Sequence, residues 1–168
     1  DLYLHWREAL VLDTLASLLR HLPIGLFSLS GLEQYVRHTL TRGGRSNDFR
    51  RLRRQLLIPA TALDTGAITV FGASRRERTP ISAAVAASAA VPLLFEPVGI
   101  DGVDYVDAAI TKTAHAGLAL DRGAKLMVIV NPVRPLVCDQ ASRGSIRSGG
   151  PLAVASQALR ITLQRRLH

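Results

Sequence analysis

Apolar residues recur every three or four positions near both ends of the chain, which is the spacing of an amphipathic helix. This spacing predicts helices over residues 1–22 and Pro151–Leu167. Ser30 and Glu33 have the three-residue separation of a capping box, in which the two side chains satisfy free amides of a first helical turn. We therefore expect a further helix over Gly31–Leu40.

Two runs of strand-like composition follow and predict a first pair of strands, Leu56–Leu63 and Ile68–Phe71. A short Asp-Thr-Gly-Ala turn separates them. Pro59 has no backbone N–H to donate to a neighbouring strand. It therefore favours an edge position or a bulge for the first strand of the pair.

A second pair of strands is predicted near the middle of the chain. The runs Glu96–Ile100 and Val103–Val106 flank Asp101-Gly102, a dipeptide that is typical of a two-residue hairpin turn. The second run leads directly to Asp107, which is followed by two alanines. A carboxylate at the end of a strand, without a bulky neighbour, is well placed to face a site.

Helical patterns surround this second hairpin. An alanine-rich segment predicts a helix over Ile81–Ala90, with Thr79 as its cap and Pro80 at its first position. After the hairpin, a helix over Thr113–Arg122 and a buried strand over Leu126–Val130 would complete a β–α–β-like passage. Together these elements predict an α/β fold.

The composition indicates one globular domain over residues 1–168, with a Ser-, Gly- and Arg-rich mobile loop over residues 139–150. No apolar run reaches the length of a membrane-spanning helix, and no signal peptide is recognised. The single cysteine, Cys138, excludes an internal disulfide and a cysteine-based zinc site. Metal-ligand spacing and a phosphate-binding loop are also absent from the sequence, so no cofactor is expected. We expect a cytoplasmic protein or one peripheral to a membrane.

The formal net charge of +8 and the pI near 10.9 favour anionic partners. Much of the charge lies in one basic run, which only Asp48 opposes. The arginines of this run are Arg42, Arg45, Arg50, Arg51, Arg53 and Arg54. We interpret the run either as a contact for anionic lipid headgroups or as a solvated surface. Nucleic acid is not the expected partner, because only Phe49 interleaves the arginines as an aromatic residue.

Most of the chain resembles the patatin-like phospholipases, a family of lipid acyl hydrolases. Four motifs carry the resemblance, in this order: ALDTGAITVFG, TPISAAVAASAAVPLLFEPV, IDGVDYVDAAI and KTAHAGLALDRGAKLMVIVNP. The resemblance implies a three-layer α/β/α hydrolase fold and hydrolysis of lipid acyl esters by a Ser–Asp dyad. The family's Tyr-Val-Asp-Gly-Gly/Ala sequence carries the catalytic aspartate, and it corresponds here to Tyr105–Ala109. The resemblance therefore implies that Asp107 is the general base, with a pKa raised by partial burial.

The sequence departs from the family in two respects. Ala108 stands where the family nearly always has glycine, and a positive φ there would strain the alanine by about 1 kcal/mol or more. The Gly-x-Ser-x-Gly motif that holds the family's nucleophile is absent from the sequence. Residues 25–31 are the most similar segment, but the spacing of their glycines and serines does not match the motif. We therefore expect an N-terminally truncated patatin-like domain, in which the nucleophile segment is absent.

Other candidate residues have simpler interpretations. Asp101 is explained by the hairpin turn, and Asp104 is expected to face solvent. His115 is interpreted as a helix-packing or surface residue, because the resembled family uses no catalytic histidine. Ser82 and Ser88 lack flanking glycines and are interpreted as small packing residues.

Two functions remain as the main alternatives, and nucleic-acid association through Arg42–Arg54 is a weaker third. The first is a lipid acyl ester hydrolase of which this chain holds only the aspartate, so that the chain alone is inactive. The second is a catalytically inactive module of the same fold that binds lipid or a membrane surface. An intact Gly-x-Ser-x-Gly motif in sequence upstream of residue 1 would favour the first.

Overall fold

The computed structural model describes residues 25, 27–73, 78–92, 94–112, 114–130 and 146–165. At the centre of this described part lies a four-stranded antiparallel sheet with the strand order β2-β1-β4-β3. The strands are β1 (Ile58–Ala62), β2 (Ile68–Phe71), β3 (Val98–Ile100) and β4 (Val103–Asp107). Both predicted hairpins are thus formed, and the pairing of β1 with β4 joins them into one sheet.

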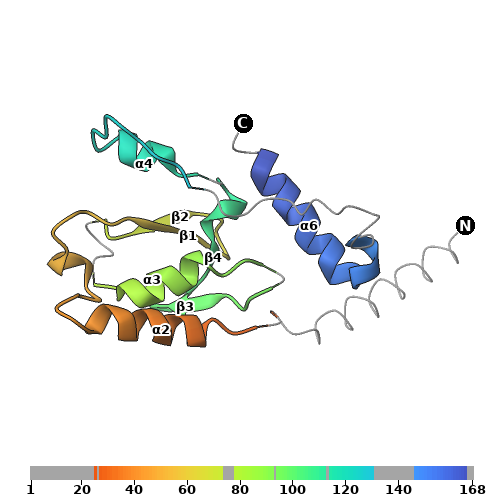
Figure 1. Cartoon of the computed structure of the whole chain (residues 1–168), viewed down its shortest axis with the longest axis horizontal. Coiled ribbons are helices and arrows are strands. Elements are labelled where there is room, and N and C mark those ends of the chain that lie inside the picture. Colours follow the sequence, from red (N-terminus) through yellow and green to blue (C-terminus); the bar gives the residue numbers. More distant parts are fainter. Residues whose placement is uncertain are drawn as a thin grey trace, which may run out of the picture.

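Within the same residues, four α-helices and three short 3₁₀ helices accompany the sheet. The α-helices are α2 (Ser30–Thr41), α3 (Ile81–Ser88), α4 (Ala116–Leu120) and α6 (Gly150–Arg165). The 3₁₀ helices are η1 (Phe49–Arg51), η2 (Ala108–Ile110) and η3 (Ile146–Gly149). In Figure 1, α2 and α3 lie on one side of the sheet and α4 lies on the other. This mixture of helices with one sheet fits the predicted α/β class.

The core lies between the sheet and α3. Tyr105 and Phe71 are fully buried, and their rings meet edge to face with centroids 5.2 Å apart. Ala84 and Ala87 of α3 belong to the same buried cluster and are fully buried as well. Their small side chains let the helix backbone approach the sheet closely, which explains the alanine-rich sequence of α3.

The β3–β4 hairpin turns at Asp101-Gly102, as its sequence predicts. Both residues have left-handed backbone conformations, with φ of 51° and 78°, as a two-residue type I′ turn requires. β4 runs one residue further than expected and ends at Asp107. The hairpin therefore sets the position of the candidate catalytic carboxylate.

Pro59 does not mark an edge strand, so that prediction is wrong. β1 is an inner strand between β2 and β4. However, Pro59 is opposite Val70 of β2, and pairing with β4 begins one residue later, at Ala60. The proline thus lies beyond the last β4 partner, where its missing N–H removes no hydrogen bond from the sheet.

The N-terminus of α3 is capped from a distant loop and not by Thr79. The helix begins at Ile81, and Pro80 is the residue before its first turn, with no capping side chain. Instead, the Asn47 backbone oxygen accepts from the Ile81 amide at 3.1 Å, and Asn47 Oδ1 accepts from the Ser82 amide at 2.8 Å. Asn47 therefore satisfies two of the free amides that open the helix.

The expected helix near residue 31 is present, but its capping box is not formed. α2 has no side-chain cap, and the Ser30 amide donates to Ser28 Oγ at 3.2 Å. The Glu33 carboxylate accepts from Arg37 one turn later and from Ser82 Oγ at 2.8 Å. The Glu33 carboxylate therefore joins α2 to α3, because it accepts from Arg37 and Ser82 and not, as a capping box would require, from the Ser30 amide.

Ser82 is more than the small packing residue that we expected. Its side chain is fully buried, accepts from Asn47 Nδ2 at 2.9 Å and donates to Glu33. Replacing Ser82 with alanine should lower the free energy of unfolding by about 1–3 kcal/mol, because its two half-buried partners, Asn47 and Glu33, each lose a hydrogen bond. Ser88→Ala, on the same helix but outside this network, is the control. Equal shifts of the two variants in urea unfolding would contradict this assignment.

The segment after η2 differs from the prediction. The helix is shorter than the expected Thr113–Arg122 and spans only Ala116–Leu120. Leu126–Val130 is neither buried nor paired with a strand, so that prediction is wrong: Leu126 is 85% exposed, Val128 81% and Val130 83%. None of the strands in the described sheet lies beside this apolar run to cover it.

Other predictions fall partly or wholly outside the described residues. The helix over residues 1–22, Cys138 and residues 139–145 of the predicted loop lie outside them. The rest of that loop forms η3 and the first residue of α6. The helix predicted over Pro151–Leu167 is confirmed by α6 as far as Arg165. Within the part of the chain that the structure describes, no helix has both the length and the apolar character needed to cross a bilayer.

Candidate active site

Three elements fix the position of Asp107. It is the last residue of β4, where it pairs with Ala60 of β1. Its amide donates to the carbonyl of Ala90, just beyond α3, at 2.9 Å. Its carboxylate caps η2 by accepting from the Ala109 amide at 2.8 Å. The side chain is therefore held at the junction of the sheet, α3 and η2.

The environment of Asp107 suits a general base. Its side chain is half-buried, and burial raises the pKa of Asp107 although the Ala109 hydrogen bond and the charge of His115 oppose the change. The expected direction of the shift is thus confirmed. A carboxylate with a raised pKa is a better proton acceptor than an exposed one, since its ionised form is less stabilised by water.

Ala108 does not have the positive φ that would strain an alanine at this position. It is buried at the start of η2, and Asp101 is the one non-glycine residue with positive φ in the described part of the chain. The Ala108 carbonyl accepts from the Thr111 hydroxyl at 2.8 Å and from the Thr111 amide at 3.0 Å. Alanine therefore fits this 3₁₀ turn without the left-handed conformation that glycine favours.

The neighbouring titratable residues fall into different environments. Asp104 faces solvent, as predicted, and Asp101 lies exposed in the hairpin turn. His115 precedes α4 and is half-buried, and its Nε2 atom is buried with no hydrogen-bond partner among the residues that the structure describes. The interpretation of His115 as a simple packing or surface residue is therefore incomplete. Its position depends on the tertiary fold, so no pattern in the sequence could have revealed it.

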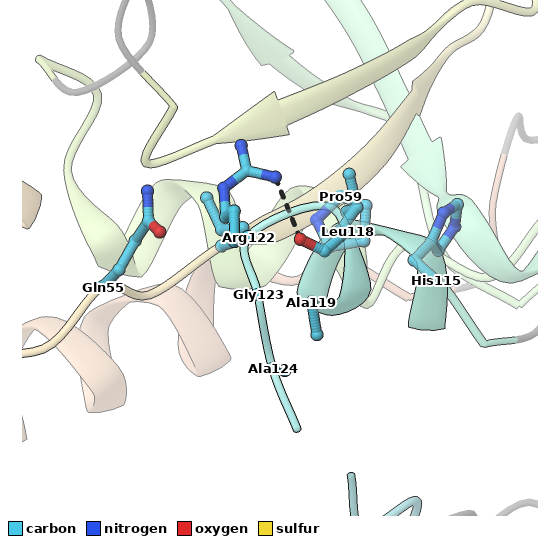
Figure 2. Close-up of a pocket in the computed structure, with 9 residues that line it drawn as sticks. Gln55, Pro59, His115, Leu118, Ala119, Arg122, Gly123 and Ala124 are labelled. Atoms are coloured by element: carbon cyan, nitrogen blue, oxygen red, sulfur yellow. Dashed lines mark hydrogen bonds between the residues drawn. The ribbon is translucent and has the colours of Figure 1, made fainter. Parts of the chain in front are cut away.

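A pocket of about 450 Å³ lies between the start of β1 and α4. In Figure 2, Gln55 and His115 lie at opposite ends of the pocket, with Pro59 and Leu118 between them. Arg122 also lines it and donates to the Leu118 carbonyl at 3.0 Å. Asp107 is not one of the lining residues. Gln55, Arg122 and His115 are thus the polar lining residues, and the rest of the wall is apolar.

The described residues supply no partner for Asp107 that could act as a nucleophile. The carboxylate accepts a hydrogen bond from Ala109, and no serine in the described ranges donates to it. Ser82 is fully buried and bonded to Glu33, so it cannot reach a substrate. The same ranges contain no group of three or more His, Cys, Asp or Glu side chains that could hold a metal ion.

The fold and this site define an α/β protein with a half-buried carboxylate at a strand end. A family model described as patatin-like phospholipase matches residues 4–120 of the sequence. The chain therefore belongs to the patatin-like phospholipase family, whose members are in general lipid acyl hydrolases. A search of curated proteins returned no significant match.

Replacing Asp107 with asparagine should stabilise the fold at neutral pH. The pKa of Asp107 is raised in the folded state, so its ionised form carries a desolvation cost at any pH above that value. Asparagine has no charge to desolvate and keeps an oxygen for Ala109. The gain should shrink as the pH falls through the raised pKa and vanish below the usual value of 3.8. Thermal unfolding across this range, with Asp104→Asn as the control, measures it; lower stability of Asp107→Asn at neutral pH would contradict the expectation.

Proposed function

We propose that this chain supplies the aspartate of a patatin-like lipid acyl ester hydrolase, with Asp107 as the general base of a Ser–Asp dyad. The observation that carries the proposal is the state of Asp107 itself. Its carboxylate is half-buried at the end of β4, it is held in place by Ala109, and its pKa is raised by burial. It also occupies the position of the aspartate in the motif that the chain shares with its family.

The serine of the proposed dyad belongs to a Gly-x-Ser-x-Gly segment, which this sequence does not contain. Asp107 removes the proton of the serine hydroxyl as the serine oxygen attacks the ester carbonyl carbon. The C–O bond to the alcohol then breaks, the alcohol leaves with a proton from Asp107, and an acyl-serine remains. Asp107 next takes a proton from water as the water oxygen attacks the acyl-serine carbonyl. The bond from that carbonyl to the serine oxygen then breaks, Asp107 returns the proton to the serine oxygen, and the fatty acid leaves. The aspartate ends each cycle unprotonated.

The proposal includes a three-layer α/β/α fold of which this chain forms an N-terminally truncated part. The exposed apolar run Leu126–Val130 supports it. Consecutive apolar residues without alternation are typical of a strand that is buried on both faces of a parallel sheet. In the described part of this chain the run is exposed and forms no strand, so the proposal assigns its cover to the rest of the three-layer domain.

Assay of the isolated chain against a chromogenic fatty-acyl ester tests the proposal that this chain holds the aspartate of the dyad but not the serine. We expect turnover no faster than the uncatalysed reaction, because Asp107 alone has no nucleophile to activate. The Asp107→Ala variant should give the same background. Robust turnover that survives this substitution would contradict both the missing nucleophile and the role of Asp107.

A second candidate function is a catalytically inactive module that binds lipid or a membrane surface. One observation favours it: Asp107 does not line the apolar pocket, so the pocket could hold an acyl chain without chemistry. The two functions differ in a polypeptide that joins this chain to its upstream sequence. Hydrolysis by that polypeptide supports the enzyme, whereas lipid binding without hydrolysis supports the module.

A further inference from the structure

The loop between α2 and β1 is anchored to the core at two points. Asn47 is bonded through its side chain to Ser82 and through its carbonyl to Ile81. Phe49 is buried in the core, where its ring packs so close to Gly72 that a Cβ atom on this glycine would lie 2.7 Å from it. The backbone around these anchors is therefore fixed, and the charged side chains on either side of them point outward.

We call residues 42–54 the basic loop. All six of its arginines are exposed. Arg50 forms a two-point ion pair with Asp48, through Nη2 to Oδ2 at 2.7 Å and Nε to Oδ1 at 2.9 Å. This hydrogen bonding lowers the pKa of Asp48 to about 2, so the aspartate is charged and neutralises Arg50. The other five arginines form no ion pair with the residues that the structure describes: Arg42, Arg45, Arg51, Arg53 and Arg54.

The basic loop runs directly into the wall of the pocket. Arg53 and Arg54 are followed by Gln55, a lining residue, and by Leu56, which is 39% exposed. On the other wall, Leu120 follows the lining residue Ala119 and is 55% exposed. Uncompensated positive charge thus adjoins exposed leucines and an apolar pocket. A bilayer with anionic headgroups presents the same two features, charge at the surface and apolar chains beneath.

The geometry points to the basic loop as the docking surface of this protein for an anionic phospholipid bilayer, with the leucines beside the pocket facing the lipid. The choice of a lipid surface rests on the proposed function, since an acyl hydrolase must meet its substrate at such a surface. Nucleic acid is the weaker alternative, because Phe49 is the loop's one aromatic residue and it is buried, so no base can stack on it.

Co-sedimentation of the chain with vesicles tests this assignment. The chain should bind vesicles of phosphatidylcholine mixed with phosphatidylserine, and binding to pure phosphatidylcholine should be far weaker. Arg53→Gln and Arg54→Gln should each weaken binding about fivefold, which is the contribution of one basic residue near an anionic surface. Arg78→Gln removes an exposed arginine outside the basic loop and should leave binding unchanged. Binding should also weaken as salt is added.

Three results would overturn the assignment. One is equal binding to neutral and anionic vesicles, and another is an equal loss for Arg53→Gln and Arg78→Gln. The third is binding to duplex RNA that is at least as tight as vesicle binding and depends on the same arginines. Asp107→Asn separates docking from chemistry, because it should not change vesicle binding. Docking can therefore fail while hydrolysis stands, or stand while hydrolysis fails.

Discussion

Replacing Asp107 with asparagine is expected to lower kcat for acyl ester hydrolysis by about 10²–10⁴-fold, the range that a general base contributes. The measurement requires a polypeptide that joins this chain to the proposed Gly-x-Ser-x-Gly segment. Asparagine cannot take the serine proton, but its side-chain oxygen can still accept from the Ala109 amide. The substitution therefore removes the base and keeps the cap of η2, so KM should change little.

Asp104→Asn is the matched control for this loss. Asp104 lies three residues earlier on the same strand and is exposed. The control removes one carboxylate from β4, as the test variant does, and should leave kcat unchanged. Similar losses in the two variants would point to a general effect of charge on β4. A fully active Asp107→Asn variant would exclude the aspartate as the base.

Gly72→Ala is expected to lower the free energy of unfolding by about 2–5 kcal/mol. Gly72 ends the hairpin with φ of 83°, a conformation that disfavours alanine by about 1–2 kcal/mol. A Cβ atom would also lie 2.1 Å from the Leu56 carbonyl oxygen and 2.7 Å from the Phe49 ring. Since the backbone oxygen cannot move without disturbing the start of β1, this overlap adds the cost of overpacking.

Gly66→Ala separates the two contributions. Gly66 has a similar φ of 68°, but a Cβ atom added to it would meet no atom within 4 Å. Its substitution should therefore cost only about 1–2 kcal/mol, from the backbone conformation alone. Urea unfolding of both variants measures the difference. Equal costs would show that the close packing of Phe49 and Leu56 on Gly72 is not as tight as described.

The elements that depend on nearby residues are predictable from the sequence. The hairpin at Asp101-Gly102 is predicted correctly because only a few residue types tolerate two successive left-handed conformations. The strand Ile68–Phe71 has the bounds that its sequence predicts, and α2 agrees within a residue at each end. In each case the pattern within one segment determines its structure.

Interactions between distant segments are not predictable in the same way. The capping roles predicted for Thr79 and Ser30 are wrong, because Asn47 and Ser82 provide partners from far along the chain. The buried strand predicted from the apolar pattern of Leu126–Val130 is wrong, because burial requires neighbouring strands and the described sheet offers none. A local pattern shows what a segment needs, but it does not show what lies beside it.

In the candidate site, too, the features set by nearby residues are predictable from the sequence and those set by the tertiary fold are not. The position of Asp107 at a strand end and the direction of its pKa shift follow from the sequence and the family motif. The absence of strain at Ala108 does not, because it depends on a φ value that only the conformation of η2 reveals. The burial of His115 Nε2 and the pocket beside α4 also require the tertiary fold.

The most direct test of the central claim compares two pH titrations. One follows the Asp107 carboxyl carbon by NMR in the isolated chain, and the other follows kcat/KM of the polypeptide that includes the serine segment. The account predicts a carboxyl midpoint above the usual 3.8 and a loss of activity at the same pH, because the protonated aspartate cannot act as a base. Full activity at a pH where Asp107 is already protonated would contradict the account.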